Sequence, residues 1–337
     1  MGDRAIPEVR INMPEFESER KVTEILKVLS ESERPVGARI IAKELEKAGI
    51  FIGERAVRYY LRVLDERGLT ENHGYHGRTI TPRGLEELEN AIVYDRVGFV
   101  ISKIENLTYG TTFDPVRMEG GIIVNMSYIP QERFQEALKV VREVFKAGYM
   151  VSPHIKVLEE GEMEAFPVPN GKVGLATTCS ITIDGVLLKA GIPSDPRYGG
   201  IAQVRGHRLT RFTDLIAYEG SSLDPLEIFL ARGMTSVMGA VKTGSGKVLA
   251  NFREVPAAAK PKVLEVLQNL KKEGFGRTLM VGEVNRPLLS VPVGKGRFGI
   301  AIPGGMNALA AVEEMGIPTE TKAITTIMDI REMERLV

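Results

Sequence analysis

The sequence predicts an α+β protein, in which an N-terminal winged helix-turn-helix is followed by a duplicated α/β domain whose halves form a pseudo-twofold pair. Two observations support this prediction. Three short amphipathic segments and a glycine-rich basic segment follow one another in residues 18–95, which is the element order of a winged helix. In residues 98–337, blocks of similar residues recur about 125 positions apart, which indicates an internal repeat.

Composition limits the class of protein. The 337 residues, of which 43% are hydrophobic, suffice for two or three domains with a substantial core. No apolar stretch reaches the roughly 18 residues of a membrane-spanning helix, and residues 1–12 lack a signal-peptide pattern. The sequence therefore predicts a cytoplasmic protein with no membrane partner.

Cysteine, histidine and charge narrow the possible chemistry. The single cysteine, Cys179, excludes an internal disulfide and a cysteine-rich zinc site, and the 4 scattered histidines provide no complete set of metal ligands. We therefore expect neither a metal nor a cofactor. Because 44 basic residues balance 44 acidic ones, any DNA binding must depend on a local basic patch rather than on bulk charge.

The first two helices of the winged helix are predicted from apolar spacing. The segment through Glu17 is polar and aperiodic, so we expect a loose leader there and a helix capped by Ser18. A second helix should run from about Gly37 to Ala48. Core-facing residues recur at intervals of three and four. They are Val22, Ile25, Leu26 and Leu29 in the first helix and Ile40, Ile41, Leu45 and Ala48 in the second.

A third helix, from about Glu54 to Arg67, has two different faces. Its apolar half contains Ala56, Val57, Tyr60, Leu61, Val63 and Leu64. On the other half, Arg55, Arg58 and Arg62 fall within roughly 60° of one another at 100° per residue. A glycine-rich hairpin should follow from Thr70 to Thr81. Thr81 and Pro82 should begin a fourth helix, with apolar residues Leu85, Leu88 and Ile92.

The row of arginines is suited to DNA. A winged helix places its third helix in the major groove and its hairpin near the adjacent backbone, where guanidinium groups bind phosphates or guanine. The expected DNA-binding residues are Arg55, Arg58, Tyr59 and Arg62 on the helix and His76 and Arg78 in the hairpin. The alternative is a solvated face on a winged helix that binds another protein.

The repeat predicts two α/β halves, at about residues 98–215 and 216–337. Gly171 to Pro193 aligns without gaps with Gly296 to Pro318. In each half a strand, a helix, a second strand and a second helix should follow in order. They are Ile122–Met126, Gln131–Lys146, Val173–Ala176 and Ser180–Ala190 in the first half, and Val248–Phe252, Ala257–Lys272, Phe298–Ala301 and Asn307–Met315 in the second.

The two loops that precede the second helices are candidate ligand sites. Free backbone N–H groups at a helix N-terminus attract carboxylate or phosphate groups, and two such loops across a pseudo-twofold axis would share a cleft. The candidate residues are Thr177, Thr178, Cys179 and Ser180 in the first loop, Gly304, Gly305 and Asn307 in the second, and Arg197 as an added cation. The alternatives are ordinary helix capping at the loops and a structural turn at Arg197.

The chain from about Ser18 onward resembles the NrpR family of archaeal nitrogen-regulation repressors. The resemblance rests on Arg55 to Leu61 in the third helix, Gly77 to Gly84 after the hairpin, and Gly174 to Gly185 with Pro193 to Gly200 in the second domain. It implies a winged-helix domain at 18–95 and one regulatory domain at 98–337, whereas some members carry two regulatory domains. It also implies a transcriptional repressor of nitrogen-assimilation genes that binds inverted-repeat operators and releases them when the dicarboxylate 2-oxoglutarate accumulates.

The expected oligomeric state follows from DNA recognition. Because one helix in one groove reads only a few base pairs, we expect a homodimer or larger assembly on paired half-sites.

Two other functional classes are possible from the sequence. Cys179 at a helix N-terminus would suit an enzyme nucleophile, although neither His154 nor His207 lies in a recognisable motif that would identify it as the general base. A protein-binding co-regulator that never contacts DNA is the third class. We predict the DNA-binding regulator and no enzyme.

Overall fold

The chain divides into two compact units, an N-terminal unit, Met1–Arg96, and a C-terminal unit, Val97–Val337. A computed structural model describes residues 13–32, 34–47, 50–88, 99–160, 167–277 and 279–336. Two predicted helix residues, Ala48 and Ile92, lie outside these ranges. Among the helices in these ranges, none is long and apolar enough to cross a membrane.

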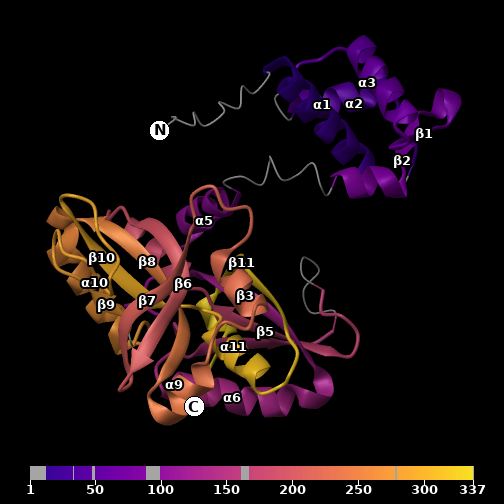
Figure 1. Ribbon diagram of the computed structural model, residues 1–337. Helices are drawn as coiled ribbons and strands as arrows, with labels where there is room; N and C mark the ends of the chain where they lie inside the picture. Colours follow the sequence, from indigo (N-terminus) through magenta and orange to yellow (C-terminus); the bar gives the residue numbers. More distant parts are fainter. Residues whose placement is uncertain are drawn as a thin grey trace, which may run out of the picture. The chain divides into compact units, whose positions relative to one another are not determined.

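The N-terminal unit has the element order of a winged helix (Figure 1). Helices α1 (Met13–Ser30), α2 (Ala38–Lys47) and α3 (Glu54–Glu66) precede strand β1 (Thr70–Asn72), the 3-10 helix η1 (Gly74–His76) and strand β2 (Arg78–Ile80). A further helical stretch covers residues 82–88. The Gly84 N–H donates to Thr81 Oγ1 over 3.0 Å, so the predicted Thr81 cap is confirmed.

Helix α1 starts earlier than the sequence analysis predicts. It begins at Met13, so the loose leader predicted through Glu17 is wrong for residues 13–17, and Ser18 lies inside the helix rather than at its cap. Pro14 is compatible with this start, because a proline in the first turn removes no hydrogen bond from the helix.

The core of the N-terminal unit follows the predicted apolar spacing with one exception in its first three helices, and in the fourth predicted helix Leu85 is 44% exposed. The fully buried residues of its three helices are Ile25, Leu26, Leu29, Ile41, Leu45, Val57, Leu61 and Leu64. Ile40 is 56% exposed, so its predicted place in the core is wrong. Ile41 and Leu45 lie four residues apart on one face of α2, and Ile40 points about 100° away from that face.

An isolated β-bridge joins the hairpin of the winged helix to the segment before α2. The N–H of Val36 donates to Arg78 O over 2.8 Å, and the N–H of Arg78 donates back to Val36 O over 3.1 Å. Gly77 lies beside this bridge at φ 110°, and a Cβ there would lie 2.3 Å from Val36 O. A glycine is therefore required for the hairpin to approach Val36 this closely.

The C-terminal unit contains two five-stranded sheets whose neighbouring strands are antiparallel. The first has the order β11-β3-β5-β4-β12 and the second the order β7-β6-β8-β10-β9. The strands of the first sheet are β3 (Gly121–Pro130), β4 (His154–Leu158), β5 (Lys172–Thr178), β11 (Glu320–Asp329) and β12 (Glu334–Arg335). Those of the second are β6 (Asp195–Arg205), β7 (Arg208–Ala217), β8 (Gly246–Pro256), β9 (Met280–Val281) and β10 (Arg297–Pro303).

Helices connect and cover these sheets. They are α5 (Phe99–Gly110), α6 (Phe134–Lys146), α7 (Ile181–Lys189), α8 (Pro225–Ala231), α9 (Val237–Thr243), α10 (Lys260–Lys272) and α11 (Asn307–Glu314), with short 3-10 helices η2 (Gln131–Arg133), η3 (Ala257–Ala259) and η4 (Ile330–Glu332). Helices α6, α9 and α11 pack against one another (Figure 1), and α7 contacts both α5 and α10. The succession β3-η2-α6 is repeated as β8-η3-α10, and β5-α7 as β10-α11, so the predicted duplicated fold is confirmed.

The two sheets are not the two halves of the sequence. Strand β6 follows α7 of the first half but pairs with β8 of the second. Reciprocally, β11 follows α11 of the second half but pairs with β3 of the first. The division at about residue 215 therefore does not separate two independent α/β layers, because each half completes the sheet of the other. This exchange brings the loop before α7 and the loop before α11 into one interface, which we call the seam.

Candidate functional site

The arginine row of α3 lies on the exposed face of the helix. Val57, Leu61 and Leu64 occupy the buried face, and the residues on the other side, Arg55, Arg58, Tyr59 and Arg62, are exposed. The Arg58 side chain is 70% exposed and pairs with Glu54, with 2.5 Å between Nη2 and Oε1. A surface hollow of about 340 Å³ is lined by Glu54, Arg55 and Arg58. This face can therefore meet an extended anion without unfolding the core.

Of the two predicted hairpin residues, His76 is accessible to a DNA or protein partner and Arg78 is largely buried. His76 is exposed. The Arg78 side chain is only 18% exposed, and it donates from Nε to Asp65 Oδ2 over 2.9 Å, with Nη2 2.8 Å from the same oxygen. Arg78 thus ties the hairpin to α3 through Nε and Nη2, so these two nitrogens are directed into the protein rather than toward a partner.

The exposed aromatic residue at the tip of the hairpin was not predicted from the sequence. Tyr75 lies in η1 at the tip of the hairpin and its side chain is fully exposed. Its position between Gly74 and Gly77 in a predicted turn was the available signal, because side chains at a hairpin tip rarely find a core to pack against.

The predicted ligand loops meet at the seam, as two loops across a pseudo-twofold axis should. The Thr177 hydroxyl donates to Gly305 O over 3.4 Å, and a Cβ on Gly305 would lie 2.7 Å from Thr178 O. Thr177 and Thr178 belong to strand β5 rather than to a loop. Every predicted loop residue from Thr177 to Ser180, and Gly304, Gly305 and Asn307, is buried.

The backbone N–H groups expected to be free at these loops are engaged. Cys179 N–H donates to Ile123 O and Gly304 N–H donates to Leu249 O, each over 2.8 Å. These two bonds occupy equivalent positions in the repeat and fix each loop to the first strand of its own half. The prediction of free donors is therefore wrong for Cys179 and Gly304.

Asn307 and Thr182 form an equivalent pair of clamps. Thr182 Oγ1 accepts from Ile123 N–H and donates to Ile123 O, both over 3.0 Å. Asn307 accepts from Leu249 N–H over 2.8 Å and donates to Leu249 O over 2.9 Å and to Tyr149 O over 3.0 Å. Since the Asn307 amide oxygen and both its N–H groups are engaged with Leu249 and Tyr149, these contacts explain its presence without a ligand.

A small cavity lies within the seam. Its volume is about 10 Å³ and its lining includes Asn125, Ser180, Tyr218, Asn251 and Gly305. A space of this size holds about one water molecule. The predicted shared cleft is therefore too small for a metabolite-sized ligand in this conformation.

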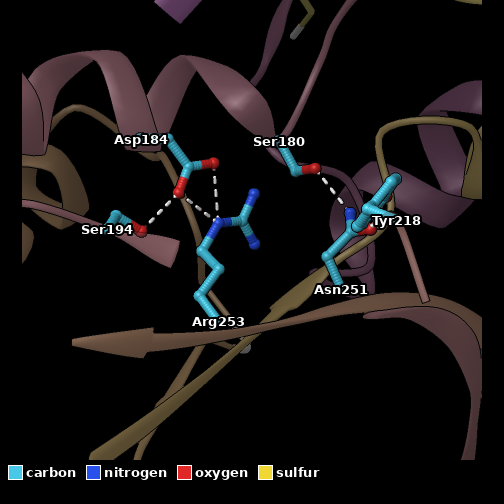
Figure 2. A network of polar contacts seen from close by, with 6 residues as sticks. All are labelled: Ser180, Asp184, Ser194, Tyr218, Asn251 and Arg253. Carbon is cyan, nitrogen blue, oxygen red and sulfur yellow. Dashed lines mark hydrogen bonds and ion pairs between the residues drawn. The ribbon is translucent and has the colours of Figure 1, made fainter. Parts of the chain in front are cut away.

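Two equivalent asparagines face this cavity with different partners. Asn251 on β8 donates to Ser180 Oγ over 2.6 Å and accepts from the Tyr218 hydroxyl over 2.5 Å (Figure 2). Asn125 on β3 accepts from Ile324 N–H over 3.0 Å, but its Nδ2 has no acceptor among the described residues. In the repeat Gly305 stands where the other half has Ser180, so the hydroxyl that would accept from Asn125 is missing.

Beside this cavity lies a buried ion pair that the sequence analysis did not single out. Arg253 on β8 is 0% exposed, and its Nε donates to Asp184 Oδ1 over 2.5 Å and to Oδ2 over 2.7 Å. Ser194 also donates to Asp184 Oδ1, over 2.6 Å. Figure 2 shows this ion pair next to the Ser180, Asn251 and Tyr218 cluster, as two neighbouring hydrogen-bonded groups whose Asp184 and Ser180 lie at the start of α7 and whose Arg253 and Asn251 lie on β8.

Arg197 does not join the seam cavity. It lies in β6, its Nη1 is 3.7 Å from Asp195 Oδ2, and it is absent from the cavity lining. The structure thus brings the two predicted loops together but places the predicted cation elsewhere.

Burial shifts the ionisation of two groups that line the cavity. It raises the pKa of the Cys179 thiol to about 12, which strongly disfavours the thiolate that a cysteine nucleophile requires. It also raises the pKa of Asp224 to about 7, with a further contribution from Glu227. The arrangement is therefore better suited to binding a polar ligand than to nucleophilic catalysis by Cys179.

Comparisons with known proteins cover both units. Residues 97–335 match the family described as NrpR regulatory domains NRD1 and 2, and residues 23–88 match the ribonuclease R winged-helix domain. The chain is 46% identical over 318 residues to the global nitrogen regulator NrpRI of Methanosarcina mazei, an alignment that covers 94% of this chain and 98% of that protein.

Two further relatives differ in length or coverage. The global nitrogen regulator NrpR of Methanococcus maripaludis is 37% identical over 316 residues, which cover 93% of this chain but 54% of that protein. The chain thus spans about half the length of that relative. The crystal structure of a nitrogen repressor-like protein from Methanococcus jannaschii has a TM-score of 0.60 and 30% identity, and covers 71% of this chain and 98% of its own.

Proposed function

This chain belongs to the NrpR family, and from that premise we propose that it is a nitrogen-regulating transcriptional repressor that binds operator DNA through α3. The curated relatives are named global nitrogen regulators. The observation that carries the DNA-binding part of the proposal is the exposed row formed by Arg55, Arg58 and Arg62 on the third helix of a winged helix.

The chemistry of this row favours DNA over a protein partner. Guanidinium groups on a groove-inserted helix bind phosphates and pair with guanine through two hydrogen bonds. Tyr59 is exposed on the same side of α3, and His76 is exposed in the hairpin, where it would reach the neighbouring backbone. Arg78 is left out of this proposed contact surface because it pairs with Asp65.

We also propose a homodimer or larger assembly. A single winged helix reads only a few base pairs, and a symmetric pair of recognition helices reads two half-sites about one helical turn, or a multiple of it, apart. An inverted-repeat operator follows from this symmetry.

The proposed effector is 2-oxoglutarate, bound at the seam by residues of the loops at Thr177–Ser180 and Gly304–Gly305. Support comes from the family, from the reciprocal strand exchange that brings the two loops together, and from the polar groups that surround the cavity. Because that cavity has room for about one water molecule, a dicarboxylate can enter only if the two loops move apart. Binding would then favour a conformation with an open seam, and the operator would favour the other one.

Operator binding by an α3 variant tests this function. Replacement of Arg55, Arg58 and Arg62 by alanine should abolish or strongly weaken binding to an inverted-repeat duplex. A folded variant with wild-type affinity would instead favour the protein-binding alternative for this face.

A further inference from the structure

The guanidinium of Arg253 has unused hydrogen-bonding capacity in a fully buried position. Its Nε is paired with Asp184, but Nη1 and Nη2 have no acceptor among the described residues. The great majority of buried polar groups in folded proteins have a hydrogen-bond partner, and four unpaired N–H groups on one cation are costly. A buried arginine in this state requires a physical explanation.

The unpaired nitrogens lie next to the seam cavity. Asn251 and Arg253 are two residues apart on β8, so their side chains point to the same face of the strand. Ser180 and Asp184 are four residues apart at the start of α7, so they also share a face. The Asn251 to Ser180 hydrogen bond lines the cavity, and the Arg253 to Asp184 ion pair is the next step along the same strand and helix.

The orientation of the Arg253 guanidinium also places its unpaired nitrogens beside the seam. In Figure 2 the two terminal nitrogens point away from Ser194, toward the side on which Ser180 and Asn251 lie. The charge of Arg253 also lowers the pKa of Tyr218 and of Cys179 against the larger effect of burial, and both of these residues line the cavity. Arg253 thus acts electrostatically on the space between the loops.

We propose that Arg253 is the carboxylate-binding residue of the effector site, an inference that rests on the seam being that site. When the seam opens, the Nη1 and Nη2 pair presents two parallel N–H donors, the geometry that binds a carboxylate through both oxygens. Asp184 holds the guanidinium by Nε, which leaves Nη1 and Nη2 directed away from Asp184 and toward the seam. Ser180 and Asn251 supply neutral donors and acceptors beside it, and the orphaned Asn125 Nδ2 supplies another donor from the opposite half.

A larger neighbouring cavity is a poor alternative for an anion. It has a volume of about 330 Å³ and its lining includes the carboxylates of Glu105, Asp184 and Asp195. A dicarboxylate placed there would be repelled by these three groups, because like charges at short range in a partly buried site interact strongly. The carboxylate is therefore assigned to the seam side of the ion pair.

Titration calorimetry of the full chain with 2-oxoglutarate tests this assignment. In Arg253→Lys, a cation remains beside Asp184 but the two-pronged donor geometry is lost. We expect binding at least about tenfold weaker than in the wild type, since charged hydrogen bonds of this kind commonly account for one or two orders of magnitude. The matched control is Arg331→Lys, which alters an exposed arginine already engaged with Asp329 through Nε and Nη2 and should bind as the wild type does.

A second variant covers the case in which Arg253→Lys does not fold. The double variant Asp184→Asn with Arg253→Gln removes both buried charges together, so neither is left unpaired, and it should show no binding at concentrations that saturate the wild type. Wild-type affinity in either folded variant would overturn the role of Arg253 while leaving the effector proposal intact. Absence of 2-oxoglutarate binding to the wild type at millimolar concentration would overturn the effector proposal itself, and this inference with it.

Discussion

Replacement of Arg55, Arg58 and Arg62 by alanine separates DNA binding from folding. The three side chains lie on the face of α3 opposite the buried Val57 and Leu61, so their removal creates no cavity. Arg58 pairs with Glu54, and both side chains are exposed; pairs of this kind contribute little to stability. The thermal unfolding midpoint should therefore remain close to that of the wild type.

The expected loss of affinity has two components. Each arginine that contacts a base should contribute about 1 to 3 kcal/mol to specific binding. Each arginine that contacts a phosphate should instead change the slope of log affinity against log salt by about 0.9, so three phosphate contacts would reduce that slope by about 2.7. The salt dependence therefore reports how the row divides between bases and backbone.

Fluorescence anisotropy over a series of salt concentrations would measure both components. The probe is a labelled duplex that carries an inverted repeat, taken from the region upstream of a glutamine synthetase gene of the source organism where that region contains one. The control is a triple alanine variant at Arg117, Arg142 and Arg331, exposed arginines of the C-terminal unit, which removes the same charge elsewhere. Unchanged affinity and slope in the folded α3 variant, or equal losses in the control, would refute the assignment of α3 to the groove.

Two further predictions concern the seam. Gly305→Ala should destabilise the C-terminal unit by about 1 to 3 kcal/mol, because its Cβ would lie 2.5 Å from Asn125 Nδ2 and 2.7 Å from Thr178 O. An unfolding midpoint equal to that of the wild type would show that the seam is looser than described. Burial and Glu227 raise the pKa of Asp224 to about 7, so the proton bound there stabilises the folded state at low pH and this stabilisation is lost as pH rises from about 4 through 7. Asp224→Asn should therefore make the free energy of unfolding fall less over that range, and an identical pH profile in chemical denaturation would contradict the buried, protonated carboxyl.

Local patterns in the sequence were sufficient for most helices and for the recognition face. The spacing of Val57, Leu61 and Leu64 placed the arginines of α3 on the opposite side without any knowledge of tertiary contacts, and Thr81 with Pro82 marked the start of the following helix. The repeat was visible because glycines and prolines at turns kept their spacing. These signals are local, so they can be recognised in the sequence without knowledge of the tertiary structure.

Strand pairing and buried charge could not be inferred in the same way. The residues of β6 do not indicate that it pairs with β8 of the second half rather than with a strand of the first half, because strand pairing depends on chain segments far apart in sequence. Strand β8 was expected to end at Phe252, whereas it continues to Pro256 and buries Arg253. A charged residue usually indicates exposure, and only the partner Asp184, 69 residues away, makes its burial possible.

The measurement that bears most directly on the proposed function is the operator affinity of the wild-type full chain with and without saturating 2-oxoglutarate. A coupling of about 1 to 3 kcal/mol predicts that the metabolite weakens operator binding roughly 5- to 150-fold, and that operator DNA weakens metabolite binding by the same factor. Operator affinity that stays constant while calorimetry shows the metabolite bound would contradict the proposed release mechanism.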